Sequence, residues 1–117
     1  MSRVTVGRLA FSPDGRQLVA VTDLGTVTAW DVTTHNVVFT LHGTYGPVAF
    51  SPDSQRLVLA SSEGSLLIVR PDSGEKICTI PGLRGNGSSV TFRDNSSLVA
   101  AVAIGPKLVV YVWKAGP

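Results

Sequence analysis

Leu9-Ala10-Phe11-Ser12-Pro13-Asp14 recurs 39 positions further along the chain as Val48-Ala49-Phe50-Ser51-Pro52-Asp53. The positions that follow keep the same spacing, because Leu18 corresponds to Leu57. A period of about 40 residues is typical of repeat proteins, in which each unit buries its apolar faces against its neighbours. The stretch therefore predicts an array of similar units.

A third, more divergent copy begins at Val90-Thr91-Phe92-Arg93-Asp94 and continues through Leu98 and Gly105. This copy has a shortened turn that lacks the proline of the other two. We expect one repeat segment over residues 1–117, with repeats at about 4–43, 44–82 and 83–114.

The composition is that of a folded chain with few charges. Charged residues make up 15% of the 117 residues, below the roughly 25% of an average soluble domain, and hydrophobic residues make up 44%. Ten Lys and Arg against eight Asp and Glu leave a net charge of +2, spread along the chain. Nucleic-acid binding needs clustered basic residues, so we expect no nucleic-acid partner.

Cysteine usage and apolar runs bear on the compartment. The single cysteine, Cys78, allows no disulfide within the chain, and the N-terminal residues lack the apolar core of a signal peptide. The longest apolar runs, Leu98–Ile104 and Leu108–Trp113, are too short to cross a bilayer as helices. We expect an intracellular protein without membrane association, in the cytoplasm first and with the nucleus left open.

Short segments rich in Val, Leu, Thr, Ile and aromatic residues, spaced about every 8 to 12 residues, predict an all-β fold. No stretch sustains a helical period. The expected strands are Val4–Phe11, Gln17–Thr22, Thr26–Asp31, Val37–Leu41, Pro47–Phe50, Arg56–Ser61, Ser65–Arg70, Lys76–Ile80, Ser89–Phe92, Leu98–Ile104 and Lys107–Trp113.

Polar turns separate these strands. In Ser12-Pro13-Asp14-Gly15 the proline presets φ at the first corner and the glycine supplies a positive φ at the exit, where the second copy has Ser54. Strands such as Leu57-Val58-Leu59-Ala60 are apolar on both faces, which is typical of sheets covered on two sides. Small antiparallel sheets stacked around an axis form a β-propeller.

The turn motif and the stretch Leu18–Asp31, which closes on Trp30-Asp31, resemble the WD-repeat (Trp-Asp repeat) family of β-propellers. The resemblance covers nearly the whole chain as three degenerate repeats. It implies a partial β-propeller of about three four-stranded antiparallel blades, the last incomplete. It also implies that the aromatic rings of Trp30 and Tyr111 are buried between blades.

The chain departs from the family in its buried polar network. Where the family places a Ser/Thr, an Asp and the Trp, the first copy has Ala20, Leu24 and Trp30, and no copy completes the set. We therefore expect apolar packing to hold the blades together. The missing network would contribute only about 0.5 to 1.5 kcal/mol per hydrogen bond.

Closure is a second departure, because propellers close with about four to eight blades. Three blades form an open arc with an apolar face at each end, and large exposed apolar patches are rare on monomers. We expect either the remaining blades of a longer chain or self-association, for instance two arcs that complete six blades.

No group of residues has the pattern of a catalytic or metal site. His35, His42 and Cys78 are scattered over the repeats without the spacing of zinc ligands. The glycine-rich stretch Gly82–Ser89 leads into a strand and lacks a Lys-Ser/Thr pair, so it reads as a connector and not as a phosphate site. We expect no catalytic residue, no metal and no cofactor.

The resemblance implies a non-enzymatic scaffold that binds other proteins on the propeller rim. That rim comprises the connections before each first strand and the tight turns before each third strand, with Tyr45, Arg84 and Lys107 as the candidate contacts, because Tyr and Arg are enriched in binding hot spots. Two alternatives stay open: a structural segment of a larger propeller or a cytoskeletal or multidomain assembly, and, with less support, an enzyme with its active site in a propeller channel.

Overall fold

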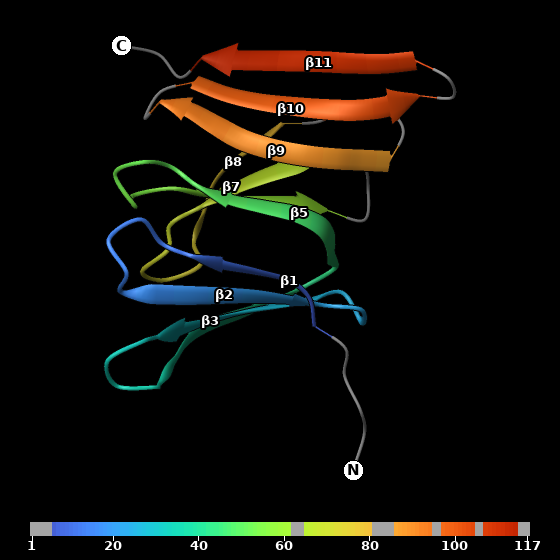
Figure 1. Cartoon of the computed structure of the whole chain (residues 1–117). Helices are drawn as coiled ribbons and strands as arrows, with labels where there is room; N and C mark the ends of the chain where they lie inside the picture. Colours follow the sequence, from blue (N-terminus) through green and yellow to red (C-terminus); the bar gives the residue numbers. More distant parts are fainter. Residues whose placement is uncertain (1–5, 62–64, 81–85, 95–96, 105–106, 115–117) are drawn as a thin grey trace.

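A computed structural model describes residues 6–61, 65–80, 86–94, 97–104 and 107–114, and these residues form three antiparallel β-sheets (Figure 1). Sheet 1 contains β1 (Val6–Phe11), β2 (Gln17–Thr22), β3 (Thr26–Asp31) and β4 (Val37–His42). Sheet 2 contains β5 (Thr44–Phe50), β6 (Leu57–Ser61), β7 (Leu66–Val69) and β8 (Lys76–Ile80). Sheet 3 contains β9 (Asn86–Asp94), β10 (Ser97–Ile104) and β11 (Lys107–Lys114).

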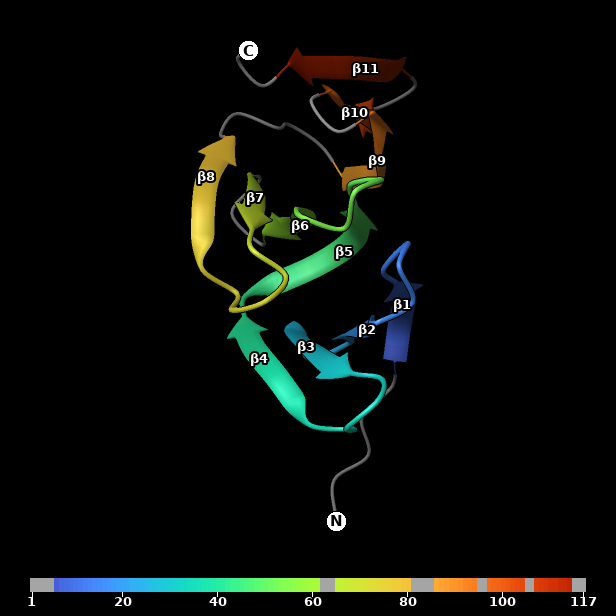
Figure 2. The same ribbon diagram turned by 90° about the vertical axis from the view of Figure 1, so that its left-hand side faces the viewer.

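The all-β prediction is confirmed, as is the incomplete third unit, which has three strands within the described residues. In each sheet the strands lie in chain order, so every connection within a sheet joins neighbouring antiparallel strands. The sheets are stacked on one another, with the outer strands β4 and β8 together at one side of the stack (Figure 2). β5 lies against β1 of sheet 1 and against β9 of sheet 3.

The connection from sheet 1 to sheet 2 is shorter than the sequence suggested. The expected loop over Leu41–Pro47 is reduced to Gly43, whose φ of 78° turns the chain from β4 directly into β5. The backbone N–H of Thr44 donates to the carbonyl oxygen of Gly25 at 3.2 Å, which fixes the start of β5. Pro47 fits within this strand because the β5–β6 register shifts between Thr44 and Val48.

The two Ser-Pro-Asp turns have the same hydrogen bonds. The Ser12 hydroxyl donates to Asp14 Oδ1 at 2.6 Å, and the Ser51 hydroxyl donates to Asp53 Oδ1 at 2.6 Å. The exit residues both have a positive φ, 75° at Gly15 and 62° at Ser54. The positive φ predicted for Gly15 is confirmed, and the second copy adopts the same turn although it has a side chain there.

The core consists of two apolar layers between the sheets. The layer between sheets 1 and 2 contains Val19, Val21, Val27, Ala29, Phe39, Leu57, Leu59 and Val69. The layer between sheets 2 and 3 contains Val58, Leu66 and Val90, with Ala49, Ala60, Ile68, Ile80 and Phe92 against it. Leu57, Val58 and Leu59 are all at most 1% exposed, so β6 is covered on both faces, as its apolar sequence predicted.

The strand register shows which residue of sheet 3 is equivalent to Trp30 of sheet 1. Leu18 pairs with Trp30 across β2 and β3, and Leu98 pairs with Trp113 across β10 and β11. Trp113 therefore takes the position of Trp30 in sheet 3, whereas Tyr111, for which the resemblance implied the same environment as Trp30, pairs with Ala100. The difference arises because β10 and β11 have 8 residues each, against 6 in β2 and β3, so Trp113 lies further along the chain from Leu98 than Trp30 does from Leu18.

Candidate functional site

The face of sheet 1 that points away from sheet 2 is exposed and apolar. It carries Leu9, Phe11, Leu18, Trp30 and Val32, which we call the head face. Phe11 pairs with Leu18, and Leu18 pairs with Trp30, so these three side chains lie side by side across the sheet. Around them is a cavity of about 370 Å³, bordered also by Asp31 and His35.

The head face corresponds, residue by residue, to a buried face of sheet 2. Leu9 and Phe11 are each 64% exposed, whereas Val48 and Phe50 pack against the core between sheets 1 and 2. The equivalent residue in sheet 3, Val90, is 7% exposed. Within the described residues, this sequence position is covered in sheets 2 and 3, which each pack on another sheet at this face, and exposed in sheet 1.

The burial of the Trp30 ring differs from the prediction, because this ring also lies on the exposed head face. We expected the ring to be buried between blades, but it is half-buried and lines the head-face cavity. Its counterpart in sheet 2, Val69, is 1% exposed because sheet 1 packs over it.

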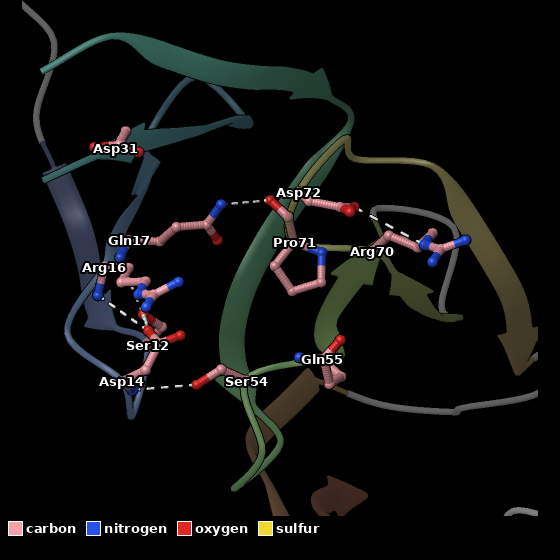
Figure 3. A pocket seen from close by; sticks show the side chains of 10 residues that line it. All are labelled: Ser12, Asp14, Arg16, Gln17, Asp31, Ser54, Gln55, Arg70, Pro71 and Asp72. Atoms are coloured by element: carbon pink, nitrogen blue, oxygen red, sulfur yellow. Dashed lines mark hydrogen bonds and ion pairs between the residues drawn. The ribbon is translucent and has the colours of Figure 1, made fainter. Parts of the chain in front are cut away.

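A polar cleft of about 260 Å³ lies between sheets 1 and 2 at the edge that carries the Ser-Pro-Asp turns (Figure 3). Gln17 Nε2 donates to the carbonyl oxygen of Pro71 at 2.7 Å, and the backbone N–H of Asp14 donates to Ser54 Oγ at 3.2 Å. Both bonds cross between the sheets, so the cleft is a polar seam that aligns them. The residues around it are Ser12, Asp14, Arg16, Gln17, Asp31, Ser54, Gln55, Arg70, Pro71 and Asp72.

The aspartates of these turns are held in their ionised form. The Ser12 hydroxyl and the backbone N–H of Arg16 lower the pKa of Asp14. The Ser51 hydroxyl and the backbone N–H of Gln55 lower the pKa of Asp53 in the same way. A carboxylate with this environment accepts turn hydrogen bonds and is a poor proton donor near neutral pH.

Asp31 has a related structural role at the β3–β4 turn. Its Oδ1 accepts the backbone N–H groups of Thr33 and Thr34, each at 2.9 Å. The bond from Thr34 is the largest cause that lowers the pKa of Asp31; desolvation, the next largest, opposes it, and the bond from Thr33 lowers the pKa further. In the described part of the chain, no three His, Cys, Asp or Glu side chains are grouped so as to hold a metal ion.

The opposite edge of the sheets is the rim that the sequence singled out. Tyr45 lies in β5 and not in a loop, and Lys107 is the first residue of β11, but the side chains of both are outside the described residues. Arg84 lies outside the described residues altogether. The contacts proposed for these three residues stay predictions.

The sequence placed the turn Asp23–Gly25 on the rim but did not single out Leu24 as a candidate contact. Leu24, at the tip of the β2–β3 turn, is 64% exposed. Its turn is fixed by Gly25, whose φ is 78° and whose N–H donates to the carbonyl oxygen of Thr22 at 3.2 Å. The available signal was an apolar residue at a turn position where the second copy has Glu63.

Comparison with solved structures identifies the fold. The Cps50 (Swd1) β-propeller domain of Myceliophteria thermophila superposes with a TM-score of 0.74 at 18% identity, over 96% of this chain and 40% of that one. The structure of U3-55K gives 0.80 at 18% identity, over 97% of this chain and 37% of that one. The RRP9 WD40 repeats give 0.78 at 18% identity, over 97% and 36%.

The chain therefore has the fold of a WD40 β-propeller, of which it forms an arc of three sheets. It spans about two fifths of the length of each of these three chains. No family model and no curated protein matches the sequence. Within the described residues, no helix is long and apolar enough to span a membrane.

Proposed function

We propose that this chain is a non-enzymatic protein-interaction scaffold of the WD-repeat kind, which binds other intracellular proteins on its rim. The WD40 fold supports a scaffold of this general type. The proposal concerns the docking surface of this arc, because the chain spans about two fifths of the propellers it resembles. Tyr45, Arg84 and Lys107 are its candidate contacts, to which we add Leu24.

The observation that carries the proposal is the geometry of Leu24. Its side chain is 64% exposed on a turn with two backbone hydrogen bonds, from Gly25 to Thr22 and from Thr44 to Gly25. A rigid backbone that presents an apolar side chain loses little conformational entropy on binding, which favours affinity. Tyr45 follows Thr44 directly, so the second candidate contact is anchored to the same turn.

The test is affinity capture from cells with the chain as bait, followed by identification and quantification of the bound proteins. One variant carries Leu24→Glu, and a second carries Tyr45→Ala, Arg84→Ala and Lys107→Ala. The expected result is a loss of at least about tenfold in the same set of bound proteins, since a hot-spot residue contributes about 2 kcal/mol or more.

The matched control changes the opposite edge through Arg16→Ala, Gln55→Ala and Arg70→Ala, which line the polar cleft and should leave binding unchanged. Retention of every partner by both rim variants would show that the rim is not the docking surface. Native mass spectrometry that detected a tightly bound metal or cofactor would instead favour a propeller enzyme.

A further inference from the structure

The far end of the arc carries a second apolar face, placed by strand register. In sheet 3, Thr91 of β9 pairs with Val99 of β10, and Val99 pairs with Val112 of β11. Thr91 is exposed, and Val112 is 56% exposed. These positions lie on the opposite side of sheet 3 from Val90, whose side chain packs toward sheet 2.

The same face continues along the β10–β11 pairing, which is regular throughout. Positions two residues apart share a face, so the pairs Ala101–Val110 and Ala103–Leu108 lie on the side of Val99 and Val112. Every β10 and β11 residue at these register positions is apolar, and β9 adds the polar positions Thr91 and Ser89 at the edge of the sheet. We call this set the tail face; its positions are Val99, Ala101, Ala103, Leu108, Val110 and Val112.

The tail face is the repeat counterpart of faces that are buried in the other sheets. Leu18, Leu57 and Leu98 are equivalent, so Val99 follows the pattern of Val19 and Val58. Val19 packs in the layer between sheets 1 and 2, Val58 packs in the layer between sheets 2 and 3, and both are 0% exposed.

Val112 fits the same pattern on the next strand. Trp30 and Trp113 are equivalent by register, so Val112 corresponds to Ala29. Ala29 is 0% exposed and packs against sheet 2. The head face and the tail face thus correspond to the two sides of one kind of sheet–sheet contact. The chain forms this contact twice, between sheets 1 and 2 and between sheets 2 and 3.

We propose that copies of this chain associate head to tail, so that the tail face of one copy packs on the head face of the next. The head face matches the faces of sheets 2 and 3 that cover a preceding sheet. The tail face matches the faces of sheets 1 and 2 that receive a following sheet. Such an interface joins unlike surfaces, so repetition produces either a closed ring or an open chain of copies.

The occupant is a second copy because the contact repeats an interface already present in the chain. Two copies joined in this way supply six stacked sheets from the two sets of three. The exposed Phe11 and Val112 would then have the environments that Phe50 and Ala29 have now. This inference does not depend on the rim proposal, because Leu24 lies in the β2–β3 turn and belongs to neither end face.

The test is a complementation experiment read by sedimentation equilibrium. The head variant carries Leu9→Glu and Phe11→Glu, and the tail variant carries Val112→Glu. A glutamate buried in an apolar interface without a partner is strongly unfavourable, so each variant alone should have the 12.3 kDa mass of one chain. The unmodified chain should have a mass of two or more chains.

A mixture of the two variants is the decisive sample. The head variant keeps its tail face and the tail variant keeps its head face, so one junction forms and the mass should double and stop there. A misfolded variant could not restore assembly in this mixture, and circular dichroism of each variant checks the sheet content independently. Leu24→Glu is the matched control, because Leu24 is as exposed as Phe11 but lies on the rim.

Three results would overturn the proposal: an unmodified chain of single-chain mass, a tail variant that still self-associates, or a mixture that stays at single-chain mass. The Leu24→Glu control separates this inference from the proposed function. That variant should assemble like the unmodified chain while losing captured proteins. In the unmodified chain, assembly without capture of proteins would contradict the proposed function, and capture without assembly would contradict this inference.

Discussion

Phe11 of sheet 1 and Phe50 of sheet 2 occupy the same position of two successive repeats, yet their surroundings differ. Phe11 is 64% exposed, while Phe50 packs against the core between the two sheets. Around Phe11 and Phe50 the strands pair in the same way, with Leu18 and Leu57 as their partners. The difference shows that burial in this fold is a property of the neighbouring sheet and not of the repeat itself.

The two Ser-Pro-Asp turns, in contrast, have the same structure in sheets 1 and 2. Ser12 and Ser51 accept a backbone N–H at 3.0 Å from Gln17 and Arg56 respectively, as part of the same hydrogen-bond pattern. These bonds form within a few residues, so they do not depend on which sheet lies beside them. The repeats are alike where structure is local and unlike where it depends on stacking.

The largest expected effect is on the free energy of unfolding and is seen when Leu57→Ala is compared with Leu18→Ala. Leu57 is 0% exposed, so its truncation should destabilise the chain by about 2 to 5 kcal/mol through lost burial and a cavity. Leu18 is half-buried on the open head face, and its truncation should cost roughly 1 kcal/mol, because water fills the space. Urea unfolding in the Val112→Glu background, where the head face has no partner, measures both. Equal losses would contradict the comparison.

An intermediate effect is expected in the β3–β4 turn and in the equivalent β7–β8 turn. Gly74 lies in the second turn, and His35 is its counterpart in the first. Both have a positive φ, 75° and 64°, but a Cβ at Gly74 would lie 2.7 Å from Cγ of Phe39. Gly74→Ala should therefore destabilise the chain by about 1 to 3 kcal/mol, from backbone strain and overpacking.

His35→Gly is the reciprocal change and should stabilise the chain by less than about 1 kcal/mol. A left-handed backbone is unfavourable by roughly 1 to 2 kcal/mol for a residue with a side chain, and glycine removes this strain. Glycine also raises the conformational entropy of the unfolded chain, which offsets part of the gain. The midpoint of thermal unfolding reports both signs. A neutral Gly74→Ala would mean that the Phe39 ring moves aside without loss.

The smallest expected effect is on the pH dependence of stability. It distinguishes the aspartates of the two Ser-Pro-Asp turns from an aspartate elsewhere on the surface. The pKa values of Asp14 and Asp53 are lowered in the folded state, so the unfolded chain binds protons first as the pH falls. Their contribution is complete above the ordinary aspartate pKa and is lost as the pH falls below it, through the lowered values.

Unfolding measured from pH 6 down to pH 2 should therefore become less pH-dependent in Asp14→Asn and Asp53→Asn, by similar small amounts. Asp72→Asn, at an exposed position outside both turns, is the matched control. If the control flattened the profile as much as the turn variants, the turn hydrogen bonds would not be the cause.

Much of the fold could be predicted from particular residues. The 39-residue repeat of Ser-Pro-Asp located the turns, and short segments rich in Val, Leu, Thr, Ile and aromatic residues located the strands within a few residues. The exceptions have physical causes: β5 begins at Thr44 because Gly43 turns the chain at once, and Trp113 replaces Tyr111 as the equivalent of Trp30 because register decides the alignment.

The candidate sites were harder to predict. The rim was foreseen as a region, but Leu24 was not, because exposure of an apolar turn residue becomes visible only when the turn is placed on the sheet edge. The polar seam between Gln17 and Pro71 joins residues 54 positions apart, which no local pattern indicates.

By itself the sequence determined the repeat, the strands and the turns, because these depend on the residue types of short segments and on hydrogen bonds between near neighbours in the chain. Only the tertiary structure decided which copies of an equivalent residue are covered. Phe11 and Phe50 read alike in the sequence, and a face becomes core only where another sheet removes it from water.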